Sequence, residues 1–200
     1  MVDAGVVEIV GSKIAKVDRR AGPVTHDLGA VTLMPGLIDV HVHLGYIAWP
    51  DPKAGALEPL ASFRSDALLS NARSTLLAGF TTVQSLGGDD RPLRDAIAAG
   101  IVVGPRVVTA VRQIWGLKWT PDELRAQVRA AKADGADVIK FMASGVFLAG
   151  GKMNVTPEQL EAVCVEAKRQ ALSARAKTNS DFDSATRCNS SSAGRRACRG

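Results

Sequence analysis

The sequence predicts an α/β protein in which strand and helix segments alternate along a chain of 200 residues. Apolar segments of strand length alternate with segments of helical periodicity over residues 36–170. Hydrophobic residues make up 46% of the chain and charged residues 22%, which is enough for one sizeable core and excludes disorder as the dominant state. Residues 1–35 differ, because only short strands are expected there.

The N-terminal segment, residues 1–35, is expected to form a small β module. Its strands are predicted at 6–10 (VVEIV), 13–17 (KIAKV) and 30–34 (AVTLM). Gly11-Ser12 lies between the first two strands and has the composition of a turn. The first two strands are therefore expected to be joined by a short turn.

From residue 36 onward the pattern is typical of βα units and a parallel sheet. Strands are predicted at 37–42, 80–86, 106–110 and 137–141, and helices at 61–78, 91–99, 121–134 and 157–170. The last two helices have explicit start signals, because Thr120 and Thr156 stand at the N-cap position and a proline follows each. Glu123 and Gln159 complete a capping box in each case.

The spacing of these units predicts about the first four βα units of a TIM-like (β/α)8 barrel, because a full barrel takes ~250 residues, or ~31 per unit. Residues 171–200 contain no apolar run of strand length and no helical stripe. We expect that segment to be a disordered or frameshifted tail. Half a barrel leaves two open sheet edges, which favours a homo-oligomer.

Charge and composition exclude several classes of partner. The net charge is +5, and residues 171–200 account for most of it, with six Lys or Arg residues against two Asp. This tail has one aromatic residue for base stacking, so we expect no nucleic-acid partner. No uncharged apolar run reaches 18 residues and the N-terminus lacks the pattern of a secretory signal, so we expect no membrane partner. Three widely spaced cysteines predict neither a disulfide framework nor a CxxC metal site and favour the cytoplasm.

The strongest chemical signal is LMPGLIDVHVHLG, from Leu33 to Gly45. Side chains alternate along a strand, so His41 and His43 project from one face and can bind a single metal ion. Gly45 ends the strand, which places both rings at its carboxyl end, where parallel barrels carry their active sites. A bare His-x-His pair also occurs near exposed turns without any function, and the pair alone leaves that alternative open.

The residues around this pair add a family resemblance. PGLIDVHVHLG resembles the first barrel strand of the amidohydrolase superfamily, and LLAGFTTVQSLGG at 76–88 is similar to its second strand. Gly104-Pro-Arg-Val resembles the entry to the third strand. ADGADVIKFMASGV at 133–146 is similar to the fourth strand of the imidazolonepropionase-like and prolidase-like branch, which carries a lysine there. The resemblance covers about residues 5–170 and implies a barrel flanked by a β-sandwich, to which the N-terminal module would belong.

This resemblance implies a metal-dependent amidohydrolase that uses a metal-activated hydroxide to cleave C–N bonds of a small-molecule amide, a cyclic amide or a dipeptide. It implies that His41, His43 and Lys140 hold one or two divalent metal ions, with zinc expected, and that carboxylated Lys140 bridges two of them. Burial favours the neutral lysine amine, which can take up carbon dioxide and become a carboxylate ligand. Without the resemblance, a lysine snorkelling from a strand end is the simpler interpretation of Lys140.

The sequence departs from the family pattern after residue 171. The family carries further metal and catalytic residues on later strands, namely histidines on the fifth and sixth and an aspartate on the eighth. No histidine follows His43 in this chain. Two hypotheses therefore stand: an active amidohydrolase, and a truncated, catalytically inactive fragment. Catalytic and substrate-binding residues remain unassigned.

Overall fold

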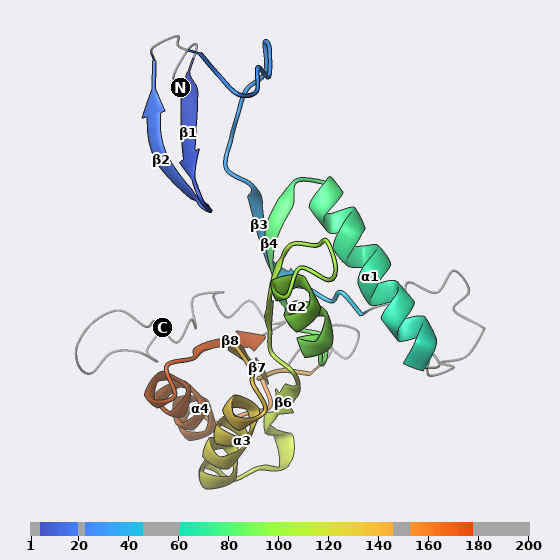
Figure 1. Cartoon of the computed structure of the whole chain (residues 1–200). Coiled ribbons are helices and arrows are strands. Elements are labelled where there is room, and N and C mark those ends of the chain that lie inside the picture. The colour runs from blue at the N-terminus through green and yellow to red at the C-terminus, as the bar shows by residue number, and fades with distance from the viewer. Residues whose placement is uncertain (1–4, 20–22, 46–60, 146–152, 178–200) are drawn as a thin grey trace. The chain divides into compact units, whose positions relative to one another are not determined.

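The computed structural model describes residues 5–19, 23–45, 61–145 and 153–177, and Figure 1 shows their elements along the chain. The chain divides into two compact units, Met1–Pro35 and Gly36–Gly200. No helix in the described ranges is long and apolar enough to cross a membrane.

The first unit contains an antiparallel hairpin of β1 (Val6–Val10) and β2 (Lys13–Asp18). Gly11 has φ of +61° in the connecting turn, a conformation that glycine adopts without steric cost. The strand predicted at 30–34 is wrong, because those residues form no regular element. Strand propensity produces a strand only when a partner is available to complete the hydrogen-bond ladder, and no described strand pairs with this segment.

The second unit alternates strands and helices, which confirms the α/β class. Its first half contains β3 (Leu37–Val42), α1 (Ala61–Leu77), β4 (Phe80–Ser85), α2 (Arg91–Ala98) and β5 (Arg106–Thr109). Its second half contains β6 (Gln113–Trp115), the 3-10 turn η1 (Gly116–Lys118), α3 (Pro121–Ala133), β7 (Val138–Met142), α4 (Pro157–Arg169) and β8 (Ser173–Lys177). The strands form two parallel sheets, β3-β4-β5 and β6-β7-β8.

The sequence predicts one strand where the structure has β5 and β6 in close succession. Val111 between them has φ of +63°, which is unusual for a β-branched residue and interrupts the extended backbone. The end of β5 nevertheless contacts the segment that leads into β7, because Asp137 N donates to Thr109 O at 2.9 Å. The Asp137 carboxylate in turn accepts from Thr109 N at 3.0 Å. Two hydrogen bonds therefore join the strands of the two sheets at this point.

Strand β8 lies inside the segment where no regular element is expected. It pairs in parallel with β7 from Val138↔Ser173 to Met142↔Lys177. Leu172 and Ala174 are buried at 7% and 5% exposure, so alternate residues reach the core even though the segment reads as polar. The tail prediction is therefore wrong for residues 173–177, because tertiary pairing supplies the strand that local composition does not indicate. Residues 178–200 lie outside the described part of the chain.

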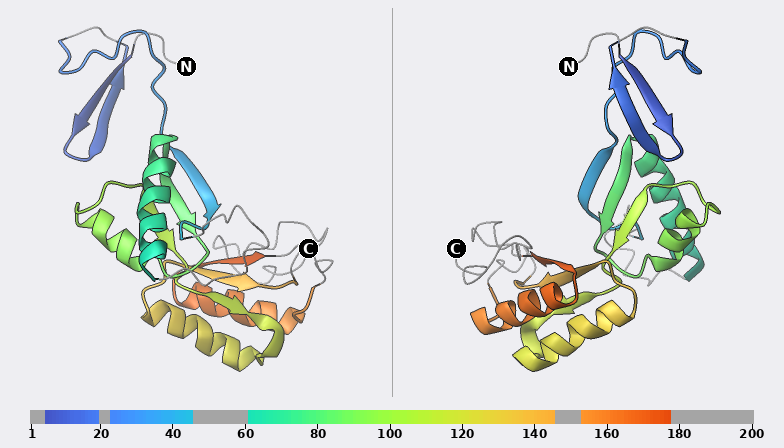
Figure 2. Two further views of the ribbon diagram at one scale, coloured as in Figure 1. Left: turned by 90° about the vertical axis from the view of Figure 1, so that its right-hand side faces the viewer. Right: turned by 60° about the vertical axis from the view of Figure 1, so that its left-hand side comes forward.

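Helices cover one face of each sheet. Figure 2 shows α3 and α4 packed against one face of β6-β7-β8. The buried residues Ile139 and Phe141 of β7 lie in one apolar cluster with Leu124 of α3 and Val163 of α4. A second cluster joins α1 and α2 to the β3-β4-β5 sheet; its buried members are Leu44, Leu68, Ala72, Val83, Leu93 and Val107. The polar side chains discussed next project from the strands away from these clusters.

Both predicted capping boxes are confirmed. Thr120 Oγ1 accepts from Glu123 N at 3.3 Å, and Thr156 Oγ1 accepts from Gln159 N at 3.2 Å. Each N3 side chain also accepts from the backbone N–H of its threonine, at 2.7 Å in α3 and 2.8 Å in α4. In α4, Cys164 is buried and disulfide-bonded, a state that the expectation of a reducing compartment does not include.

Candidate active site

The end of β3 presents two histidines on one side. The rings of His41 and His43 have their centroids 5.4 Å apart and are tilted by 41°. Val42 and Leu44, which alternate with them, pack instead into the apolar cluster beneath α1 and α2. The period-two alternation predicted from the sequence therefore holds at the level of side-chain contacts.

Hydrogen bonds from neighbouring elements fix this strand end. Leu44 N donates to Ser85 Oγ of β4 at 3.2 Å, and Leu86 N donates to Val42 O at 2.9 Å. Asn71 of α1 donates from Nδ2 to Leu44 O at 2.8 Å. The backbone on both sides of His43 is thus held by a helix and by the adjacent strand, and the imidazoles rest on a rigid support.

Gly87 is a site residue that the sequence analysis missed. A Cβ added at Gly87 would stand 2.8 Å from His43 Cγ and 2.9 Å from His43 Cβ, closer than real contacts allow. The Gly87-Gly88 pair has the composition of a turn, and nothing in the sequence indicates that a histidine ring from a distant strand lies against it. Only a glycine at this position leaves room for the observed placement of His43.

Lys140 lies in the middle of β7 and is 2% exposed. Its neighbours Ile139 and Phe141 belong to the apolar cluster with α3 and α4, so Lys140 projects from the opposite face of the strand. On that face, Lys140 Nζ lies 3.3 Å from His41 Nε2. The structure therefore brings together the three side chains that the resemblance assigns to the metal: His41, His43 and Lys140.

A second contact crosses the same face. Arg175 of β8 donates from Nε to Gln84 Oε1 of β4 at 3.1 Å. The pairs β3–β7 and β4–β8 are not neighbours in either sheet, so these two contacts join side chains of different sheets. The strands of both sheets therefore place polar groups close to one another on this face.

Two of the side chains at this site, His41 and His43, are suitable ligands for a divalent metal ion. Two imidazoles on one side of a strand end provide nitrogen ligands of the kind that zinc takes. Among the described residues there is no group of three or more His, Cys, Asp or Glu side chains that could hold a metal ion. A third ligand would come from a neutral or carboxylated Lys140.

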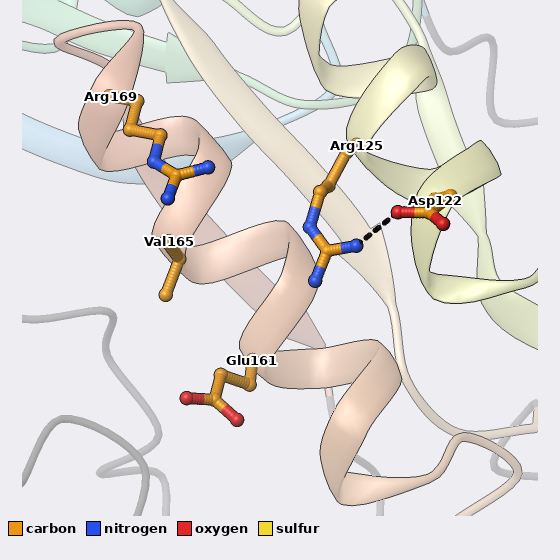
Figure 3. A pocket seen from close by; sticks show the side chains of 5 residues that line it. All are labelled: Asp122, Arg125, Glu161, Val165 and Arg169. Carbon is orange, nitrogen blue, oxygen red and sulfur yellow. Dashed lines mark hydrogen bonds and ion pairs between the residues drawn. The ribbon is translucent and has the colours of Figure 1, made fainter.

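A second cluster of charged residues lies on helices α3 and α4, away from the histidines and Lys140. A depression of about 540 Å³ on α3 and α4 is lined by Asp122, Arg125, Glu161, Val165 and Arg169. Figure 3 shows these five side chains on the two helices. Arg125 pairs with Asp122 inside it, and none of the predicted metal ligands reaches it. It lies on the helices, whereas the polar face described above belongs to the strands.

These features define an α/β protein whose parallel strands carry a His-x-His pair and a buried lysine on one polar face. The chain belongs to the Amidohydrolase family, whose model matches residues 32–181. No curated protein matches the sequence.

Solved structures give the same assignment. A Xaa-Pro dipeptidase with bound methionine matches with a TM-score of 0.70 and 27% identity, over 84% of this chain and 50% of that one. A putative prolidase from Bifidobacterium longum matches with a TM-score of 0.60 and 28% identity, over 74% of this chain and 36% of that one. The ochratoxinase of A. niger matches with a TM-score of 0.60 and 25% identity, over 72% and 42%. The chain spans about half the length of the first structures it matches, or less.

Proposed function

We propose that this chain forms the metal-binding part of a (β/α)8-barrel amidohydrolase that cleaves a C–N bond in a small-molecule amide, a cyclic amide or a dipeptide. The observation that carries the proposal is the contact of Lys140 with His41, made by strands far apart in the sequence. Membership of the Amidohydrolase family and the similarity to a Xaa-Pro dipeptidase support the reaction class.

The metal would be held by the two imidazoles and by Lys140. A divalent ion, with zinc preferred by nitrogen donors, supplies an acidified water and polarises the amide carbonyl. The chain's own residues position the ligands of that ion. Hydrogen bonds with Ser85, Leu86 and Asn71 fix the backbone around His43, which keeps both rings in position. Carboxylation of Lys140 would turn a buried amine into an oxygen ligand.

The alternative is that the chain alone is catalytically silent. It is favoured by the absence of any histidine between His43 and residue 200 of the sequence. In that case metal binding through the pair on β3 would persist while turnover would require the rest of a barrel.

Zinc binding tests the proposal directly. The full chain is expected to bind zinc in competition with a chromophoric chelator. His41→Ala or His43→Ala should each lower the zinc affinity by roughly 100-fold or more. This is a larger effect than the 10- to 100-fold loss typical when a residue that supports a metal ligand is changed. His26→Ala is the matched control, because His26 belongs to the other unit and is exposed. Equal affinities in all three variants would contradict the site.

Turnover then separates the two functional hypotheses. A panel of Xaa-Pro dipeptides and cyclic amides is incubated with the zinc-loaded chain and with the chelator-treated chain. Hydrolysis that requires metal and disappears in His43→Ala supports an active enzyme. Zinc binding without hydrolysis across the panel supports the silent fragment.

A further inference from the structure

One face of helix α4 carries opposite charges on either side of an exposed valine. Glu161, Val165 and Arg169 follow one another at intervals of four residues, so they lie along one stripe of the helix. All three line the depression on α3 and α4, and Figure 3 shows them in this order along α4. Val165 is apolar and yet 38% exposed. The stripe therefore has an acidic end, an apolar centre and a basic end.

The charges at the two ends of this stripe are little used by contacts within the chain. In the part of the chain that the structure describes, Glu161 forms no ion pair. Arg169 lies 3.7 Å from Glu166, and its side chain remains 66% exposed. Glu166 also has Arg129 at 3.4 Å and a hydrogen bond from Gln170 at 2.9 Å, so it does not depend on Arg169. Both ends of the stripe can therefore take a partner from outside the chain.

The other charges of the depression need no outside partner. Asp122 and Arg125 of α3 pair with each other at 2.5 Å. The position of Glu161 is not explained by the helix dipole either. Helix α4 begins at Pro157, so Glu161 lies beyond the first turn, where a carboxylate gains little from that dipole.

A second copy of the chain complements this stripe when the two α4 helices run antiparallel. Glu161 and Arg169 are each four residues from Val165, which is about 6 Å along the helix at ~1.5 Å per residue. A two-fold axis at Val165 therefore places Glu161 of one copy opposite the partner's Arg169, and the reverse. Val165 then lies against the partner's Val165. Self-complementarity of this kind is what a two-fold interface requires.

We propose that two copies of this chain associate through the outer face of α3 and α4, with Glu161, Val165 and Arg169 at the centre of the contact. The two symmetric ion pairs set the antiparallel orientation, and the two valines exclude water between them. The contact surface belongs to the helices, whereas the His41–Lys140 contact belongs to the strands. The inference therefore goes beyond the proposed function and does not rest on metal binding.

Sedimentation velocity of the full chain tests the proposal, at protein concentrations from low micromolar to submillimolar and at low salt. The wild-type chain is expected to show a monomer–dimer equilibrium. Glu161→Lys and Arg169→Glu should each weaken it by at least about tenfold, because each variant replaces two attractions with two repulsions. The two changes shift the net charge in opposite directions, so net charge alone cannot weaken both.

The doubly substituted chain is the decisive variant. Glu161→Lys combined with Arg169→Glu exchanges the two charges and restores both ion pairs, so its dimer should be within about threefold of the wild-type affinity. Restored dimerisation also shows that neither change prevents folding. Loss of the dimer in both single variants without rescue in the double variant would overturn the antiparallel pairing.

Two further variants locate the contact. Lys132→Glu is the matched control for Arg169→Glu, because it makes the same charge change at an exposed site on α3 outside the depression, and it should dimerise like wild type. Val165→Lys places two like charges at the two-fold axis and should abolish the dimer. A chain that stays monomeric at every concentration would overturn the inference. A dimer that tolerates Glu161→Lys and Val165→Lys would also overturn it, because the copies would then meet through another surface.

Discussion

Lys140 Nζ lies 3.3 Å from His41 Nε2, although the two residues are 99 positions apart in the sequence. Strand β7 carries the lysine and strand β3 carries the histidine, and these strands are not adjacent in either sheet. The contact therefore depends on how the two sheets lie against each other. Any change that shifts one sheet relative to the other will separate the two groups.

Replacing Lys140 with methionine is expected to stabilise the fold and impair the site. Lys140 is 2% exposed, and removing a buried amine in favour of an apolar side chain of similar length relieves a desolvation penalty. We expect Lys140→Met to raise the free energy of unfolding by about 1 kcal/mol in urea titration and to lower zinc affinity. Lys132→Met on the exposed face of α3 is the control. A loss of stability in Lys140→Met beyond that of the control would show that the buried amine is favourably paired.

Gly87→Ala is expected to disturb the metal site without touching a ligand. The new Cβ would stand 2.8 Å from His43 Cγ, and because Cγ is not the far end of a flexible chain, the ring must turn. A misplaced ligand should weaken zinc binding by about 10-fold or more, in the range found when the support of a ligand is removed. Gly145→Ala is the control, since its Cβ would meet no atom closer than 4.0 Å. Unchanged zinc affinity in Gly87→Ala would show that His43 does not bind the metal.

The sequence predicts most of the second unit because its signals are local. The capping boxes at Thr120 and Thr156 and the alternation around His41 depend on residues within a few positions of each other. All four predicted helices occur. Each begins at the predicted residue and ends one residue earlier than predicted. The pairing of Lys140 with the histidines came from the family resemblance, since no local pattern joins β3 to β7.

The features that the sequence does not predict are those that depend on distant partners. Strand β8 has a polar composition and forms because β7 offers a ladder to pair with. The role of Gly87 depends on a ring from another strand, and the bond from Arg175 to Gln84 depends on the approach of two strands, β8 and β4, from different sheets. In the first unit the opposite error occurs at 30–34, where strand propensity is present and a partner strand is not.

The two capping boxes should each contribute measurably to stability. Thr120→Ala and Thr156→Ala each remove a side-chain acceptor for an N–H of the first helical turn and should lower the free energy of unfolding by about 0.5–2 kcal/mol. Thr→Ser at the same positions keeps the acceptor and is the matched control. Chemical denaturation followed by circular dichroism measures the difference. If the Ala and Ser variants were equally stable, the caps would be energetically neutral.

Glu166 should make the stability of the second unit depend on pH. This carboxylate is buried, with a side chain 5% exposed, and it accepts from Gln170 Nε2 at 2.9 Å. The hydrogen bond from Gln170 lowers the pKa of Glu166, with further help from Arg129 at 3.4 Å and from Arg169, although burial alone would raise it.

A lowered pKa in the folded state fixes the sign of this effect. The unfolded chain binds a proton at Glu166 more readily than the folded chain does, so the stabilisation is fully present above the ordinary glutamate pKa of about 4.3. It is lost as the pH falls through the lower pKa of the folded state. Glu166→Gln should therefore lower the free energy of unfolding by about 1–3 kcal/mol at neutral pH and flatten its dependence on pH below about 5.

Urea titrations of wild type and Glu166→Gln between about pH 3 and pH 7 measure both effects. Glu161→Gln is the matched control, because Glu161 lies on the same helix and is exposed. The difference between wild type and Glu166→Gln should shrink as the pH falls, while the difference for Glu161→Gln should stay small throughout. A constant difference for Glu166→Gln would mean that the variant loses packing between α3 and α4 rather than the charge-dependent contacts of Glu166 with Gln170 and Arg129.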